Sequence, residues 1–172
     1  MTSNNKPQLL TLQKELGYSF TDPTLLSRAL THVSHERENG ADHNEVLEFL
    51  GDAVLDLAVS DLLMRRFPAR SEGDLSKMRA ALVNTSVLAE KAAQLDLGAL
   101  LCLGKGEDRS GGRTKPSILA GAFEAVLGAV YQDGGFEAAR RLVERYFTDD
   151  VKEKQLGQQD YKTRLQEISQ ML

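Results

Sequence analysis

One stretch of the sequence constrains the fold more than any other: residues 43–63, HNEVLEFLGDAVLDLAVSDLL. Read as a helix, it is apolar on almost every side, and a helix of that kind is normally buried. Yet four carboxylates recur at i, i+3, i+7 and i+11, which aligns them along one narrow stripe. These residues, called the acidic stripe below, are Glu45, Glu48, Asp52 and Asp56.

The acidic stripe needs a counter-charge. Like charges at this spacing oppose one another by about 0.2–0.5 kcal/mol per pair, and burial beside apolar side chains costs more. No Lys or Arg lies between Arg37 and Arg65. The counter-charge is therefore a basic segment from elsewhere in the chain, a proton or a metal ion.

The composition predicts a soluble globular protein, because 41% of its 172 residues are hydrophobic and 27% are charged. One cysteine and three scattered histidines argue against a disulfide within the chain and against a zinc motif. The polar N-terminus and the lack of a long apolar run make the cytoplasm the expected location. The net charge of −4 argues only weakly against a nucleic-acid partner, since the basic residues gather in one Gly-rich segment.

The pattern predicts an all-α fold, because no segment alternates with period two for long enough to form a strand. Expected helices cover residues 9–16, 22–32, 44–66, 71–83, 85–95, 117–132, 136–147 and 161–172. Asp22, Asn44, Thr85 and Ser117 are expected caps. Residues 34–41 and 103–116 read as loops, and residues 1–148 as one compact domain followed by a linker over 149–160.

A second acidic position stands in a strongly apolar segment. Glu124 is the single charge between Ser117 and Tyr131. It is either an exposed residue on the polar edge of a surface helix, or it meets Glu48 and Asp52 across a helix–helix contact. In the second case, three carboxylates without thiolate or imidazole suit a hard cation such as magnesium. The residues alone lead to a metal-dependent phosphoester enzyme or a structural acidic cluster.

At this point the sequence resembles a known family. HNEVLEFLGDAVL is similar to the signature motif of bacterial ribonuclease III. Further segments resemble that family in the same order: RALTHVSH, SEGDLSKMRAALVN, LGKGED, GGRTKPSILA, FEAVLGAVYQDGG and DYKTRLQE. The resemblance covers nearly the whole chain.

The resemblance implies a multi-helix endonuclease domain that works as a homodimer and cleaves double-stranded RNA, as in the processing of rRNA and mRNA precursors. The products would carry a 5′-phosphate and a two-nucleotide 3′ overhang. Mg²⁺, with Mn²⁺ as a substitute, would be bound by Glu48, Asp52 and Glu124, of which Asp52 and Glu124 are also the expected catalytic residues. Glu45 and Glu72 resemble a further acidic pair.

Other positions keep alternatives open. Phe49 resembles the aromatic residue that contacts the partner subunit, or it is ordinary core. Glu45 could serve only the helix dipole, and Asp56 reads as a surface acid. RNA-backbone contacts are expected from basic residues that could equally be a solvated surface. They are Lys77, Arg79, Lys105, Arg109, Arg113 and Lys115.

The sequence departs from the family at two places. Gly121 stands where the family usually has Asp, so either water or another residue takes that place, or the chain is weakened. The alternative function is therefore a non-cleaving double-stranded-RNA-binding or scaffold protein of the same fold. Residues 161–172 resemble only the first helix of a double-stranded-RNA-binding domain. Without the sheet and the second helix of that domain, RNA binding is expected to be weaker and strongly salt-dependent.

Overall fold

The computed structural model describes residues 6–39 and 42–170, with side chains at residues 7–38 and 42–152. Within these ranges the chain is helical and forms no strand, which confirms the all-α fold. An isolated parallel bridge joins Thr31 to Cys102. No helix in the described ranges has both the length and the apolar character needed to cross a membrane.

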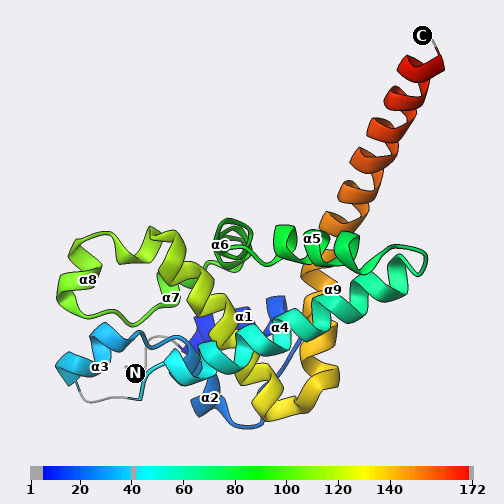
Figure 1. Ribbon diagram of the computed structural model, residues 1–172. Helices are drawn as coiled ribbons and strands as arrows, with labels where there is room; N and C mark the ends of the chain where they lie inside the picture. Colours follow the sequence, from blue (N-terminus) through cyan, green and yellow to red (C-terminus); the bar gives the residue numbers. More distant parts are fainter. Residues whose placement is uncertain (1–5, 40–41, 171–172) are drawn as a thin grey trace.

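Two long helices form the centre of the molecule (Figure 1). Helix α4 carries the acidic stripe and lies against α9, α6 packs on α9, and α5 turns back beside α4. The elements are α1 (Lys6–Leu16), α2 (Pro23–Ala29), α3 (Val33–Asn39), α4 (Glu45–Arg66), α5 (Glu72–Leu82), α6 (Thr85–Gln94), α7 (Leu97–Leu100), α8 (Lys105–Arg109), η2 (Gly112–Thr114) and α9 (Pro116–Gln170).

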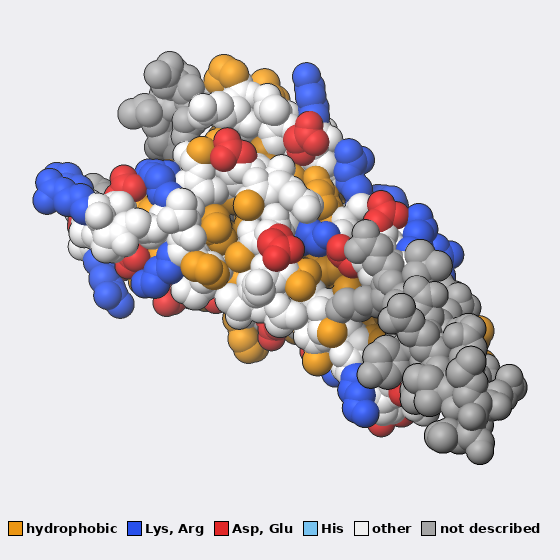
Figure 2. Space-filling model, turned by 90° about the horizontal axis from the view of Figure 1, so that it is seen from above, with side chains coloured by type: hydrophobic (Ala, Val, Ile, Leu, Met, Phe, Trp, Pro, Cys, Tyr) orange, Lys and Arg blue, Asp and Glu red, His pale blue; other side chains and the backbone are white. Residues whose placement is uncertain are grey.

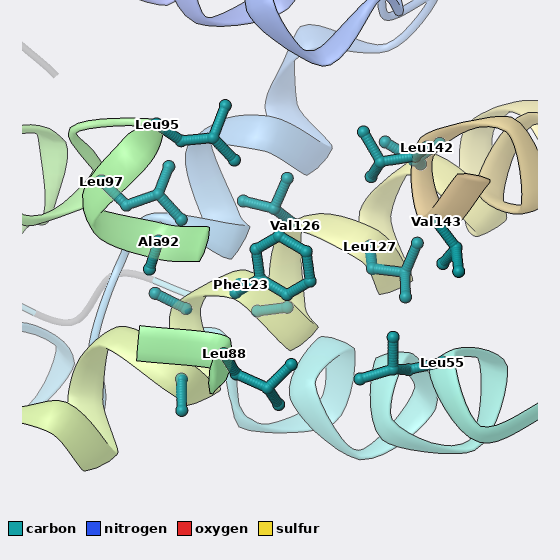
Figure 3. Close-up of a cluster of buried hydrophobic side chains, with 14 of the residues drawn as sticks. Leu55, Leu88, Ala92, Leu95, Leu97, Phe123, Val126, Leu127, Leu142 and Val143 are labelled. Atoms are coloured by element: carbon teal, nitrogen blue, oxygen red, sulfur yellow. The ribbon is translucent and has the colours of Figure 1, made fainter. Parts of the chain in front are cut away.

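The core gathers around the apolar face of α9 (Figure 3). Phe123 of α9 is 1% exposed and lies among Leu88 and Ala92 of α6 and Leu127 of its own helix. Its ring meets that of Phe147 at 6.1 Å between centroids, in an edge-on arrangement. Glu124 is the next residue of α9, so the packing of Phe123 fixes the backbone position of Glu124.

Several helix ends follow ordinary capping chemistry, and the expected cap at Asp22 is among them. The Asp22 carboxylate accepts a hydrogen bond from the backbone N–H of Thr24, and the Ser71 side chain accepts one from that of Asp74. Gly17 ends α1 with a φ of +66°. Gly135, with a φ of +74°, breaks α9 between the two helices expected over residues 117–132 and 136–147, although these continue directly into each other.

Other ends differ from the prediction. The cap of α6 is Asn84, whose side chain accepts from the N–H of Val87, so the expected Thr85 cap was wrong by one residue. Asn44 precedes α4 but makes no capping bond with its side chain. Helix α9 already begins at Pro116, before the expected cap at Ser117.

Both expected loops contain helix. Helix α3 occupies most of residues 34–41, and α8 with η2 occupies much of residues 103–116. Tertiary contacts explain this, because the Ser34 hydroxyl accepts a hydrogen bond from the N–H of Gly104 at 2.9 Å. Neither segment has an apolar period, so nothing in its own pattern indicated a helix.

The backbone of α9 continues through the expected linker, residues 149–160, to Gln170. The Asp150 carboxylate lies 2.6 Å from the ammonium of Lys91, a buried residue of α6, so the start of this segment is fixed to the helical body. The side chains of the expected first helix of an RNA-binding domain, residues 161–172, lie outside the described part. The proposed division into domains stays a prediction.

Candidate active site at the crossing of α4 and α9

The residues of the acidic stripe on α4 differ in their exposure to solvent. Its apolar residues, among them Leu47 and Leu55, are buried against the rest of the molecule. The stripe lies along the edge of this face, so that Glu48 is half-buried while Asp52 is exposed. The carboxylates therefore lie at the border between the core and solvent.

Two glycines let the backbones of α4 and α9 approach closely. A Cβ atom on Gly51 would lie 1.8 Å from the carbonyl oxygen of Glu124, and one on Gly128 would lie 2.2 Å from that of Leu47. Both distances are far below van der Waals contact, so only glycine fits at either position. This close approach places Glu124 beside the turn of α4 that carries Glu48 and Asp52.

The electrostatics of Glu124 reflect this crowding. Burial, followed in order by the nearby carboxylates of Asp52, Glu48 and Asp56, raises the pKa of Glu124 to about 7. Burial also raises the pKa of Glu48, with Glu45 and Asp52 adding to the effect. No Lys or Arg is among the groups that shift either pKa. The structure thus brings Glu48, Asp52 and Glu124 together without a neutralising cation.

The donor set has the chemistry of a hard-cation site. Its atoms are carboxylate oxygens, which Mg²⁺ and Mn²⁺ prefer, and two of the three side chains are partly removed from water. Within the described ranges, no three His, Cys, Asp or Glu side chains already stand in an arrangement that could hold a metal. The donors fit a divalent ion chemically, and their side chains would have to draw together to bind it.

Asp56 differs from the other members of the acidic stripe, because it has a cation beside it. The Arg79 Nε atom of α5 lies 3.8 Å from its carboxylate, and the Arg79 guanidinium also donates to the hydroxyl of Ser60 at 3.0 Å. A basic segment from elsewhere in the chain was one counter-charge considered for the whole acidic stripe. In the structure, Arg79 of α5 provides that counter-charge to Asp56. This pairing also occupies Arg79, one of the residues expected to contact RNA.

The second expected acidic pair is not assembled within one chain. Glu45 is exposed at the first turn of α4, 3.6 Å from the ring of His43. Glu72 opens α5, beyond the other end of α4, and accepts a hydrogen bond from Ser76. Their assignment as a functional pair stays a prediction.

Gly121 has a neighbour that the sequence did not reveal. It is buried in α9, one turn before Glu124. A Cβ atom placed on it would lie 2.6 Å from one carboxylate oxygen of Glu48. The sequence marked this position as a missing carboxylate, and the structure fills the adjoining space with the carboxylate of Glu48.

Helix α4 exposes a row of apolar side chains on the face that points away from the core. Phe49 is 79% exposed, so within this chain it is not a core residue. Val46, Leu57 and Met64 are also more than half exposed on the same helix. We call these four residues the α4 apolar row.

The basic residues expected to bind RNA fall into two groups. Arg113 donates to the backbone carbonyls of Gly98 and Leu101, both at 2.9 Å, and pairs with Asp108, so it ties α7 to α8. Lys105 and Arg109 are exposed on α8. Figure 2 shows Lys and Arg side chains at the end of the molecule that carries α8 in Figure 1.

Lys115 and Lys77 complete this set of basic residues. Lys115 is exposed and lies 3.6 Å from the carboxylate of Glu107. Lys77 is exposed on α5. Contact with RNA stays a prediction for all six of the expected basic residues.

Comparison with known proteins gives one consistent family. A family model described as Ribonuclease-III-like matches residues 22–151. Ribonuclease 3 of Desulfotalea psychrophila is 50% identical over 170 residues, which is 96% of this chain and 70% of the relative. Ribonuclease 3 of Pelotomaculum thermopropionicum is 53% identical over 169 residues, 95% of this chain and 70% of the relative.

A solved structure gives the same result at the level of the fold. The nuclease domain of ribonuclease III from Campylobacter jejuni superposes with a TM-score of 0.74 at 47% identity, covering 80% of this chain and 96% of that domain. Its description refers to structural flexibility in a region involved in dimer formation.

Proposed function

The chain belongs to the ribonuclease III family and is an endoribonuclease, and we propose that it hydrolyses double-stranded RNA with the help of a divalent metal ion. The observation that carries the metal-dependent part is the convergence of Glu48, Asp52 and Glu124 without a neighbouring cation. Three carboxylates in that state are costly to keep ionised unless a positive charge joins them.

In the proposed reaction these three side chains hold Mg²⁺, or Mn²⁺ in its place. A divalent ion bound there would supply an activated water and would stabilise the departing 3′ oxygen. We assign the orientation of the attacking water to Glu124 and Asp52, since Glu124 directly follows the buried Phe123 and Asp52 is open to solvent. The products are a 5′-phosphate, a 3′-hydroxyl and duplex ends with a two-nucleotide 3′ overhang.

We propose a homodimer that pairs through the α4 apolar row. A surface of contiguous exposed apolar side chains is typical of a protein–protein interface. Phe49 is its most exposed member and would insert into the partner subunit. The dimer provides one site per subunit, and the duplex would lie across both. Contacts to the RNA phosphates are proposed for four exposed basic residues, Lys77, Lys105, Arg109 and Lys115. Arg79 and Arg113 are also proposed to contact phosphates, in addition to the bonds that they make within the chain.

The natural substrates in this proposal are duplex regions of rRNA and mRNA precursors in the cytoplasm. A second candidate function is a non-cleaving double-stranded-RNA-binding or scaffold protein. The observation that favours it is Gly121, since α9 provides no second carboxylate one turn before Glu124.

One assay separates the two functions. The purified chain is incubated at low salt with long double-stranded RNA and Mg²⁺, Mn²⁺ or EDTA, and RNA binding is measured in parallel. The enzyme is expected to give short duplex products in either metal and none in EDTA. Bound but intact RNA in both metals would favour the scaffold function and contradict the proposed hydrolysis.

A further inference from the structure

Asp56 lies beside the proposed metal site. It follows Asp52 by four residues on α4, so the two carboxylates stand one turn apart on the same face of the helix. Asp56 is among the carboxylates that raise the pKa of Glu124, but it is not among those that raise the pKa of Glu48. Along α4, Asp52 therefore has Glu48 one turn before it and Asp56 one turn after it.

This order offers a divalent ion two sets of three carboxylates. The first set is Glu48, Asp52 and Glu124, and in the second set Asp56 takes the place of Glu48. Both sets consist of carboxylate oxygens, which suit the same hard cations. A bound ion would divide between the two sets unless one of them is already neutralised.

Arg79 of α5 neutralises the carboxylate that belongs only to the second set. Its Nε atom lies 3.8 Å from the Asp56 carboxylate, and the same guanidinium donates to the Ser60 hydroxyl at 3.0 Å. The Ser60 hydroxyl in turn donates to the backbone carbonyl of Asp56 at 2.6 Å. These contacts hold the guanidinium over one turn of α4, which uses the several donors of an arginine.

The pair of Arg79 and Asp56 does little for the stability of the fold. Both side chains are partly exposed, and ion pairs open to solvent contribute only about 0–1 kcal/mol. Its effect on charge is more important. Among the four carboxylates of the acidic stripe, Asp56 is the one with an Arg beside it in the described part of the chain.

We propose that Arg79 is a positioning residue for the metal ion, which holds the carboxylate of Asp56 and thereby confines the ion to Glu48, Asp52 and Glu124. The inference rests on the proposed function, because that function supplies the ion. Arg79 acts through Asp56 and does not itself bind the metal. Without the guanidinium, Asp56 becomes a free carboxylate one turn from Asp52, and the ion gains a second set of donors.

The proposal is tested by Mn²⁺ binding to the full chain without RNA, measured by electron paramagnetic resonance. Arg79→Met is expected to tighten Mn²⁺ binding by about fivefold or more, because it frees the Asp56 carboxylate. In an Asp56→Asn background the same substitution is expected to change the affinity by less than about twofold. Arg79→Lys keeps a positive charge beside Asp56 and is expected to stay within about twofold of the unaltered chain.

Lys77→Met is the matched control, because it removes the same charge from an exposed position of the same helix. It is expected to change Mn²⁺ affinity by less than about twofold. A gain with Arg79→Met that persists in the Asp56→Asn background, or that is no larger than the gain with Lys77→Met, would overturn the proposal. Either result would show that Arg79 acts only through its general charge.

A measurement without metal tests the contact itself. The unfolding equilibrium is measured in urea and EDTA for Arg79→Met, Asp56→Asn and the double variant, and the two positions are expected to couple by about twofold in the equilibrium constant. Absence of coupling would contradict the pairing on which the inference depends. If neither the unaltered chain nor Arg79→Met bound Mn²⁺, the proposed function would fail and this inference with it. If both bound Mn²⁺ with equal affinity, only this inference would fail.

Discussion

Glu124 carries two opposing requirements at the scale of the single residue. It is anchored in the core by Phe123, yet its carboxylate must be ionised to bind a metal. Burial and three neighbouring carboxylates favour the protonated form and raise the pKa of Glu124 to about 7. A bound cation would reverse that preference, so the protonation of this residue and the binding of metal are linked.

The pKa of Glu124 predicts how stability depends on pH without metal. Since this pKa is about 7 in the folded chain against an ordinary value of 4.5 for a glutamate, the folded state binds more protons between these values. The free energy of unfolding should therefore fall as pH rises from about 4.5 to about 7. Glu124→Gln should remove this contribution and stabilise the metal-free chain at pH 8 by about 1–2 kcal/mol, a range reduced for partial solvent exposure. Urea unfolding in EDTA at pH 5 and 8 measures both effects, and an unchanged pH slope in the variant would refute the assignment.

The sequence predicted which carboxylates come together better than it predicted their surroundings. The spacing of Glu48 and Asp52 placed them on one stripe, and the lone charge in an apolar segment marked Glu124. Gly121 was read only as a lost carboxylate, because a sequence shows which side chain is absent and not which neighbour uses the space. The pairing of Arg79 with Asp56 was equally hidden, since it joins residues of two helices.

At the scale of the helix, the close crossing of α4 and α9 is what brings Glu124 beside Glu48 and Asp52. Gly51 and Gly128 were not singled out from the sequence, although an isolated glycine inside an apolar helix often marks a close approach of another backbone. Their added Cβ atoms would meet backbone carbonyls, which cannot move aside as a flexible side chain can.

Gly51→Ala should therefore separate the two helices. Overpacking of this kind costs about 1–3 kcal/mol or more of unfolding free energy, and here it opposes the gain in helix propensity. Chemical denaturation should show a loss of at least about 2 kcal/mol, with metal affinity reduced in parallel. Gly73→Ala makes the same chemical change at a position of α5 where an added Cβ has no other atom within 4 Å, and should be neutral or stabilising. Equal effects at the two sites would contradict the close crossing.

Helices with an apolar period were predictable, and those without one were not. The end of α4 at Arg66 agrees with the expected bound and follows from Pro68, because the residue before a proline disfavours helix, and the break at Gly135 separates the two expected helices. Helix α3 did not, because it depends on contacts such as that of Ser34 with Gly104, which lies 70 residues away. Such long-range contacts leave no local signal.

At the scale of the whole molecule, the α4 apolar row is the proposed dimer surface. Phe49→Ala should leave the fold of the single chain intact, because the side chain is 79% exposed, and should weaken dimerisation by about tenfold or more. Sedimentation velocity over a range of concentrations measures the dimer, and circular dichroism monitors the helices. Leu10→Ala, at a residue of α1 that is 54% exposed, is the control. A monomeric unaltered chain at micromolar concentration would contradict the proposed dimer.

The central claim is that Glu48, Asp52 and Glu124 meet at the α4–α9 crossing to hydrolyse duplex RNA with a metal ion. Its most direct test is single-turnover cleavage of a defined RNA duplex in Mg²⁺ by the unaltered chain and by Glu124→Gln, with RNA affinity measured alongside. We predict that Glu124→Gln slows cleavage by about 1000-fold or more while RNA affinity stays within about threefold. Cleavage by the variant at a rate close to that of the unaltered chain would contradict the claim.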